Sequence, residues 1–183
     1  MNVLYNYFDY KLINPNEWYY GIKRYIITTA VWSMACKLIG LGDRHGLNIM
    51  LKPNGEVIHI DFGYVAGKGT ILPIPEIVDF RFTLNIYRTL GIFEDNGLFL
   101  FICYKTLELF KKYYSTLKSQ IEFYIFDPYF SNGDEQTYKH LKKIDNFFKN
   151  SEENLLNQII NMVNDCKDPE KLEQMFVGWM PFV

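Results

Sequence analysis

Two short segments hold most of the side chains that could do chemistry. The first spans residues 40–48, GLGDRHGLN, and places an acid, two potential cations and an amide within six residues. The second spans residues 59–63, HIDFG, and adds another carboxylate. Protein kinases use an Asp, an Asn five residues later and a D-F-G sequence beyond both, in this order. The spacing therefore predicts phosphoryl transfer, in a variant with Asp-Arg-His in place of His-Arg-Asp.

Each candidate side chain has a role that this chemistry requires. Transfer of a γ-phosphoryl group concentrates negative charge, so the site needs magnesium ions, and these prefer hard oxygen ligands. Asn48 offers an amide oxygen and Asp61 a carboxylate, which makes both predicted metal ligands. Asp43 can orient the acceptor hydroxyl and take its proton, and His45 can offset charge on the γ-phosphate. Arg44 is assigned mainly to scaffolding.

Taken singly, these features also have structural explanations. Asp-Phe-Gly is a common tripeptide, and a lone histidine is more often structural than catalytic. Asp43 and Arg44 can form a surface ion pair of little energetic weight. The correct order of loop, hairpin and D-F-G sequence favours function over coincidence.

A helix, a hairpin and a loop must position these residues. Apolar residues recur through residues 18–39 as in a largely buried helix, which Gly40 and Gly42 end. Residues 49–51 and 57–60 are apolar runs on either side of a Pro-Asn-Gly turn, which predicts a β-hairpin. Residues 63–75 contain three glycines and two prolines and predict a loop.

The remaining chain favours helices. Residues 96–117 predict one long helix, residues 130–138 an exposed connection, and residues 155–163 a further helix. The expected fold class is α+β and mostly helical. We expect a main unit over residues 1–135, a connecting helix or linker over 136–150, and a helical C-terminal unit over 151–183.

Composition limits the class of protein. The 183 residues are 49% hydrophobic and 22% charged, as in globular proteins, and the net charge of −2 gives no general reason to expect nucleic-acid binding. Cys36, Cys103 and Cys166 show neither a disulfide framework nor zinc-site spacing, so free thiols in a reducing compartment are predicted. No secretory signal or bilayer-length apolar run is evident, which favours a soluble intracellular protein.

The two segments resemble the signatures of the phosphatidylinositol 3/4-kinase superfamily, G-D-R-H-x-x-N-I/L-M and H-I-D-F-G, without a departure. The superfamily contains lipid kinases and large protein kinases related to them. Lipid kinases usually cluster Lys or Arg in the loop after the D-F-G sequence, whereas this loop offers only Lys68. Residues 75–85, PEIVDFRFTLN, are similar to the P-E-x-V-P-F-R-L-T-x-N run of the protein-kinase branch, with Asp79 replacing the usual proline.

The C-terminal residues 168–183, DPEKLEQMFVGWMPFV, resemble the FATC tail of these protein kinases, which the lipid kinases lack. The most specific part is Gly-Trp followed by an aromatic residue. We expect the tail to pack against the lobe through Leu172, Met175, Phe176 and Trp179. Within the family, the resemblance is nearest to the ATR-like branch, on residues 33–34, 40–46, 65–69, 75–78 and 174–175.

The resemblance implies the C-terminal lobe of a phosphatidylinositol 3/4-kinase-like fold over residues 1–135, followed after the linker by a FATC domain over residues 151–183. It implies a serine/threonine protein kinase that uses ATP with Mg²⁺ or Mn²⁺, prefers Ser or Thr followed by Gln, and serves nuclear DNA-damage checkpoint signalling. Its partners would be protein substrates and regulatory proteins, with no membrane and no nucleic acid bound directly by this segment. Residues beside the nucleotide would be Asn48, Met50, Ile60 and Asp61, and those of the activation loop would include Phe62, Gly63, Lys68 and Pro75.

The family fold places ATP between two lobes, and this sequence begins inside the second. We therefore expect a fragment that binds ATP poorly and is inactive alone. Two alternatives stay open: a phosphatidylinositol 3/4-kinase, and a non-catalytic interaction module. The intact Asp43, Asn48 and Asp61 argue against the module, and the absence of an upstream lobe argues for it.

Overall fold

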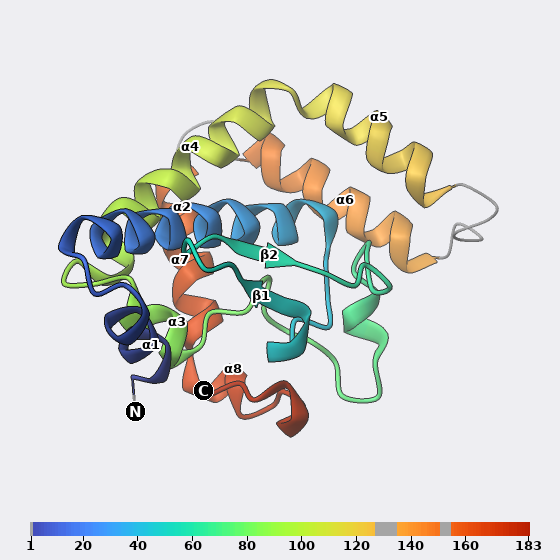
Figure 1. The fold of residues 1–183 in the computed structure, drawn as a ribbon. Coiled ribbons are helices and arrows are strands. Elements are labelled where there is room, and N and C mark those ends of the chain that lie inside the picture. The colour runs from blue at the N-terminus through green and yellow to red at the C-terminus, as the bar shows by residue number, and fades with distance from the viewer. Residues whose placement is uncertain (1, 127–134, 151–154) are drawn as a thin grey trace.

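The computed structural model describes residues 2–126, 135–150 and 155–183 and consists mainly of helices around one two-stranded sheet (Figure 1). The mostly helical α+β class predicted from the sequence is confirmed. The α-helices of the described residues are α1 (Val3–Lys11), α2 (Pro15–Ile39), α3 (Leu84–Thr89), α4 (Leu98–Lys112), α5 (Tyr114–Ile125), α6 (Glu135–Asn150), α7 (Leu155–Lys167) and α8 (Pro169–Leu172). Short 3₁₀ helices cover Gly46–Asn48, Lys68–Ile71, Glu94–Asn96 and Val177–Trp179.

Helix α2 runs through the middle of the molecule, between α4 and the sheet (Figure 1). Its start is set by Asn14, whose side chain accepts the N–H of Asn16 at 2.9 Å, and by Pro15, which occupies the first turn. Its end is set by Gly40, which adopts the left-handed conformation with φ 59°. The chain therefore enters residues 40–48 from the end of a largely buried helix.

The predicted hairpin consists of β1 (Ile49–Leu51) and β2 (Val57–His59), paired antiparallel with Ile49 opposite His59. Ile49, Leu51 and Val57 pack into the core. The ring of His59 stacks on Trp32 of α2, with ring centroids 4.6 Å apart. The hairpin is thus fixed to α2 by one face.

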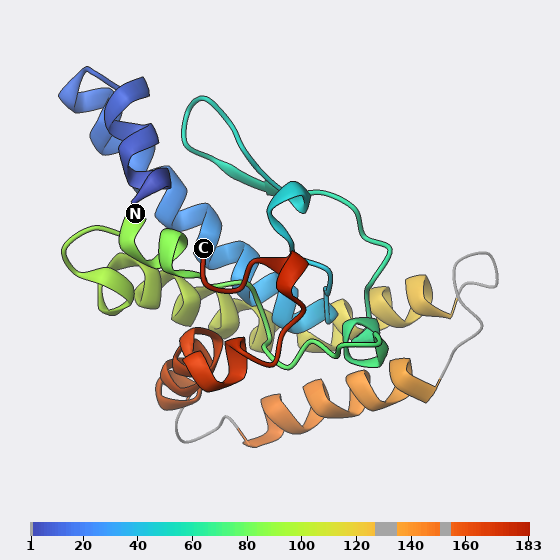
Figure 2. The same ribbon diagram turned by 90° about the horizontal axis from the view of Figure 1, so that it is seen from below.

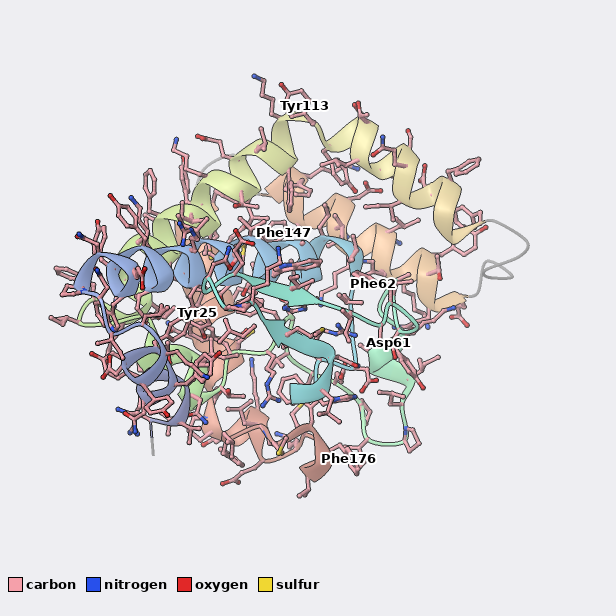
Figure 3. All side chains as sticks on the ribbon, in the orientation of Figure 1. Tyr25, Asp61, Phe62, Tyr113, Phe147 and Phe176 are labelled. Atoms are coloured by element: carbon pink, nitrogen blue, oxygen red, sulfur yellow. The ribbon has the colours of Figure 1, made fainter. Side chains whose placement is uncertain are left out.

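The main core is formed where α2, α4 and α7 meet, and aromatic rings from the segment before α3 close it. Tyr25, Met34, Phe99 and Ile159 are among its fully buried side chains. Figure 3 shows Tyr25 inside this packing and Tyr113 on the outside, where α4 meets α5. Cys36, Cys103 and Cys166 are buried free thiols, as predicted.

The structure corrects two expectations about helices. The single helix predicted for residues 96–117 is wrong, because α4 ends at Lys112 and α5 begins at Tyr114. Both Tyr114 and Lys118 bind Asp145 of α6, at 2.6 Å each, and these bonds draw α5 toward α6. The exposed connection predicted for residues 130–138 is wrong from Glu135 onward, where α6 begins, and its earlier part lies outside the described residues.

The C-terminal tail, residues 168–183, folds back beneath the core and forms a small cluster of its own (Figure 2). Leu172, Met175 and Trp179 are buried there as predicted, whereas Phe176 is 57% exposed, so its predicted packing is wrong. Helix α7 instead belongs to the main core. The domain boundaries proposed from the sequence remain predictions.

Among the described residues, no helix combines the length and the apolar character that crossing a bilayer requires.

Candidate active site

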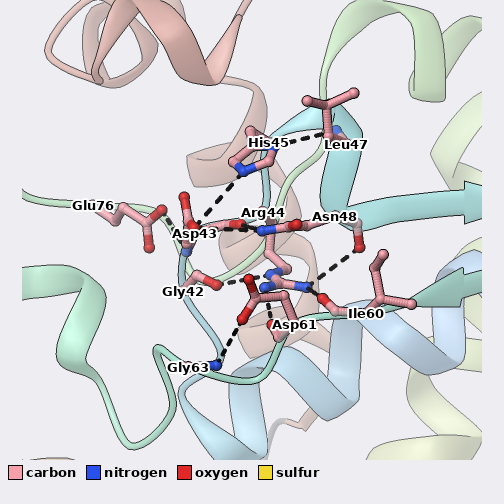
Figure 4. A network of polar contacts seen from close by, with 10 residues as sticks. All are labelled: Gly42, Asp43, Arg44, His45, Leu47, Asn48, Ile60, Asp61, Gly63 and Glu76. Atoms are coloured by element: carbon pink, nitrogen blue, oxygen red, sulfur yellow. Dashed lines mark hydrogen bonds and ion pairs between the residues drawn. The ribbon is translucent and has the colours of Figure 1, made fainter.

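Arg44 lies at the centre of residues 40–48, the predicted catalytic loop. Its side chain lies in the interior, with the residue only 2% exposed, and its guanidinium donates to main-chain carbonyls (Figure 4). Nε donates to Gly42 O at 2.7 Å, Nη1 to Ile60 O at 2.8 Å and Nη2 to Asp61 O at 2.5 Å. Arg44 therefore joins the loop to the chain entering the D-F-G sequence. These contacts agree with the scaffolding role assigned to it.

Asp43 and Asp61 both have left-handed backbones, with φ of 56° and 58°. This conformation is uncommon for residues other than glycine and often marks functional sites. Figure 4 shows both residues beside the Arg44 side chain, although they are far apart along the chain. The carboxylate of Asp61 also accepts the N–H of Gly63 at 3.1 Å, which fixes its rotation.

Asn48 is buried and oriented by Asp43. Its Nδ2 donates to Asp43 O at 2.8 Å and lies 3.4 Å from Asp43 Oδ2. Because the amide nitrogen is held by Asp43, the amide cannot rotate freely. Oδ1 is the atom of Asn48 that can bind a cation.

The His45 ring has a defined tautomer when neutral. Its Nδ1 accepts the N–H of Leu47 at 3.2 Å, so the ring proton of the neutral form lies on Nε2. Nε2 lies 3.8 Å from Asp43 Oδ2. His45 therefore presents a hydrogen-bond donor next to the Asp43 carboxylate.

The other predicted site residues lie on the hairpin and on the loop that follows it. Met50 and Ile60, expected beside the nucleotide, are 52% and 40% exposed. Both lie on the side of the hairpin that is turned away from α2. Phe62 lies near the Trp32 ring, with centroids 6.2 Å apart. Lys68 begins a 3₁₀ helix of the following loop, and Pro75 is exposed further along it. The roles of these residues remain predictions.

Sequence reasoning missed the contributions of Glu76 and His59. Glu76 Oε1 accepts the N–H of Asp43 at 2.8 Å, and burial raises the pKa of its carboxyl. Asp43 and Glu76 are 33 residues apart in the sequence, and no local pattern indicates their contact. His59 holds the D-F-G sequence against α2. Burial and the nearby Arg44 charge lower its pKa to about 4, so the stacked ring is neutral.

The donor set suits a magnesium ion shared with a nucleotide better than a metal centre made by the protein alone. In the part of the chain that the structure describes, no three His, Cys, Asp or Glu side chains gather as a metal site. Mg²⁺ is commonly held by one or two carboxylates together with substrate phosphates and water. Asp61 with the amide oxygen of Asn48 fits that pattern.

Comparison with known proteins identifies the class. Residues 1–133 match the model of the family "Phosphatidylinositol 3- and 4-kinase". The match covers most of the chain, including the loop over residues 40–48 and the D-F-G sequence. The chain therefore belongs to that family.

Individual relatives place it near the protein kinases of the family. The chain is 34% identical over 189 residues to the serine/threonine-protein kinase MEC1 of Candida albicans, covering 99% of this chain and 8% of the relative. It is 32% identical over 196 residues to the serine/threonine-protein kinase ATR of Arabidopsis thaliana, covering 98% and 7%. Its structure is similar to the FAT and kinase domain of CtTel1, with a TM-score of 0.85 and 25% identity over 98% of this chain and 14% of that one. The predicted resemblance to the phosphatidylinositol 3-kinase-related protein kinases is confirmed. The chain spans less than a tenth of these curated relatives.

Proposed function

We propose that the chain carries the catalytic and metal-binding segments of an ATP-dependent serine/threonine protein kinase. The observation that supports this most directly is the grouping of Asp43, His45, Asn48 and Asp61 around the buried Arg44. The two acids come from segments that only the fold brings together. Both have left-handed backbones, which makes a purely structural role for them costly.

The proposed mechanism divides the work between two sides of the loop. Asp61 and Asn48 Oδ1 would hold Mg²⁺ or Mn²⁺, and the exposed side chains of Met50 and Ile60 would contact the nucleotide. When bound, ATP supplies the γ-phosphoryl group and the ion neutralises its developing charge. The Asp43 carboxylate would orient the acceptor hydroxyl and take its proton. The Nε2–H of His45 would stabilise negative charge on the same side.

The loop after the D-F-G sequence favours a protein acceptor over an inositol lipid. Lys68 is the only Lys or Arg between residues 62 and 78, so the loop lacks a cluster that could hold headgroup phosphates. Its exposed side chains are largely apolar, including Ile71, Ile74 and Ile77. Such a surface suits a peptide better than a phosphorylated sugar.

The physiological setting is proposed from the resemblance alone. The ATR-like branch, together with relatives named ATR and MEC1, supports a role in nuclear DNA-damage checkpoint signalling with a preference for Ser-Gln or Thr-Gln sites. Residues 151–183 are proposed to be the FATC domain, with residues 168–183 as its tail. Activity is expected to need residues outside this chain, because the hairpin face that would contact the nucleotide is open.

The test uses an affinity-tagged copy of the gene expressed in its native cells. The purified protein should transfer phosphate from ATP to a Ser-Gln peptide but not to phosphatidylinositol vesicles. Asp61→Asn should lower this transfer at least about 100-fold, because it removes a charged metal ligand. Asp165→Asn, an exposed acid on α7, is the matched control and should leave it unchanged.

Transfer to the vesicles alone would replace the proposal with a lipid kinase. Wild-type protein that transfers phosphate to neither acceptor, or full activity in Asp61→Asn, would contradict phosphoryl transfer at this site.

A further inference from the structure

Glu76 reaches the catalytic loop from a segment that lies beyond the D-F-G sequence. Its Oε1 accepts the main-chain N–H of Asp43 at 2.8 Å, and this contact is drawn in Figure 4. Its carboxylate is largely buried, and its neighbours include the charges of Asp43 and Arg44. A buried acid that accepts a hydrogen bond from the peptide of another candidate catalytic acid is unusual, because burial of the charge has an energetic cost.

The space around Glu76 is shaped to receive this side chain. A methyl group on Gly42 would lie 2.5 Å from Glu76 Oε2, and one on Gly69 would lie 2.1 Å from it. No residue other than glycine fits at either position unless the Glu76 carboxylate moves. The two glycines therefore form a slot between the catalytic loop and the following segment, and Glu76 fills it.

Main-chain hydrogen bonds hold both walls of the slot. The Glu76 N–H donates to Gly69 O at 3.0 Å, and the Gly42 N–H donates to Tyr64 O at 2.7 Å. The first of these bonds closes the segment 64–76 on itself. The bond from Gly42, together with the Gly67 N–H that donates to Gly40 O at 2.9 Å, attaches the segment to residues 40–48 at two points in addition to the Glu76 carboxylate. The same segment carries the exposed apolar residues Ile71 and Ile74 on the proposed acceptor side.

We infer that Glu76 is a positioning residue: it holds the left-handed peptide of Asp43 and couples the acceptor-side segment to it. The inference rests on the proposed function. The hydrogen bond uses the N–H of Asp43, and a peptide with φ 56° needs such an anchor to persist. Asn48 and Asp61 are held by other contacts, to Asp43 O and the Gly63 N–H, so the metal side does not depend on Glu76 directly.

The kinetic test measures kcat and the KM for ATP separately in the tagged protein from native cells. Glu76→Ala should lower kcat about 10- to 100-fold, the equivalent of one lost charged hydrogen bond, with KM for ATP changed less than about threefold. Glu76→Gln keeps an oxygen that can accept the Asp43 N–H and should retain kcat within about fivefold. Glu173→Ala, an exposed acid in the tail, is the control and should match wild type.

The variant Asp43→Asn distinguishes a failure of the inference from a failure of the proposed function. If it abolishes transfer while Glu76→Ala keeps the wild-type kcat, the inference is wrong and the proposed function stands. If Asp43→Asn is fully active, the proposed function fails instead.

A second readout does not depend on activity. In the 183-residue chain, amide hydrogen exchange at Asp43 should accelerate in Glu76→Ala and stay near wild type in Glu76→Gln. Unchanged protection of this amide in Glu76→Ala would overturn the inference. If Glu76→Ala does not fold, Glu76→Gln decides: near-wild-type kcat and protection support the inference, and loss of both to the level of Asp43→Asn contradicts it.

Discussion

Arg44 shows how a charged residue can serve a site without touching the chemistry. Its guanidinium is enclosed and donates to the carbonyls of Gly42, Ile60 and Asp61. Burial lowers the pKa of the guanidinium, which means that the fold stabilises its charge through these carbonyls less well than water does. The net benefit is therefore conformational, because one side chain holds three carbonyls from two separate segments together.

Replacement of Arg44 by Met should strongly destabilise the chain. The substitution keeps the apolar volume of the side chain but leaves the carbonyls unpaired, at a cost of about 3 kcal/mol. Urea unfolding of the 183-residue chain measures this change. Arg88→Met, at an exposed position, should stay within about 0.5 kcal/mol of wild type. A loss below about 1 kcal/mol for Arg44→Met would show that water replaces the guanidinium easily.

His59 should make stability depend on pH. The pKa of the folded ring is about 4, below its ordinary value of 6.5, so between these values the unfolded chain binds more protons. The stabilising contribution is complete above pH 6.5 and is lost as the pH falls toward 4. The shift corresponds to about 3 kcal/mol at most. Burial also lowers the pKa of His140, which adds a change of the same sign.

The measurement compares urea unfolding at pH 7 and pH 4.5 for wild type and His59→Phe. Phenylalanine preserves the stacking on Trp32 but cannot titrate. The variant should lose less stability than wild type on acidification. An equal loss in both proteins would mean that His59 is protonated without cost in the fold.

For individual residues, the sequence was most informative where the expected chemistry requires a fixed spacing along the chain. The order of Asp43, Asn48 and Asp61 along the chain predicted one site, and in the fold these residues gather around Arg44. Glu76 could not be predicted in the same way, because its contact is with a main-chain N–H that any residue could offer. The exposure of Phe176 was missed for a related reason: an apolar residue in a short apolar tail has no periodic partner to indicate its side.

Among the elements, the C-terminal tail is contacted at three of its carbonyls by one buried side chain of the preceding lobe. Arg81 donates to the carbonyls of Trp179, Met180 and Val183, and its guanidinium lies 4.9 Å from the centre of the Trp179 ring. Burial lowers the pKa of Arg81 to about 10, so the guanidinium stays charged at neutral pH. The tail also approaches the catalytic loop, since a methyl group on Gly46 would lie 3.6 Å from Met180 Cε.

Arg81→Gln should release the tail while the main core stays folded. Three carbonyl contacts and the cation–π contact are lost together, and a segment this short does not hold its structure alone. Hydrogen exchange by mass spectrometry should show faster exchange over residues 172–183 and unchanged exchange in α2. Arg24→Gln, on the exposed side of α2, is the control. Equal protection of the tail in both variants would assign its attachment to Leu172 and Met175 instead.

Element prediction succeeded where local signals were strong. The Pro-Asn-Gly turn and the apolar runs beside it specified the hairpin, and Gly40 specified the end of α2. The break between α4 and α5 has no glycine or proline to mark it. It accompanies bonds from Tyr114 and Lys118 to Asp145, a residue of α6 that no local pattern relates to them.

For the molecule as a whole, one face of the hairpin remains open next to Asn48 and Asp61, the proposed metal ligands. Met50 and Ile60 are among the exposed apolar residues there. A nucleotide placed on this face would contact the chain on one side only. We therefore expect the 183-residue chain to bind ATP with magnesium weakly, with a Kd on the order of 1 mM, or about −4 kcal/mol.

Titration of the chain with ATP, followed by NMR, checks this expectation. Shifts should be confined to Asn48, Asp61 and the open face of the hairpin, and should diminish when magnesium is chelated. Micromolar affinity would mean that these residues form a complete site. Shifts elsewhere would place the nucleotide on another surface.

The overall class could be predicted because the catalytic motifs and the helical periodicity agree with each other. The path of the tail beneath the lobe could not, because it depends on Arg81 meeting carbonyls about a hundred residues later in the chain. Contacts at such separation leave no pattern in a single sequence.

The left-handed backbones of Asp43 and Asp61 bear on how such a lobe could change over evolutionary time. Glycine and asparagine adopt this conformation more readily than aspartate, so either replacement would relieve strain in the folded state. A lineage in which phosphoryl transfer no longer mattered could therefore gain stability by losing either acid, and would drift toward an inert but sturdier scaffold. Under the proposed function, glycine or asparagine at position 43 or 61 in a descendant of this chain would be the first sign that the lobe has lost phosphoryl transfer.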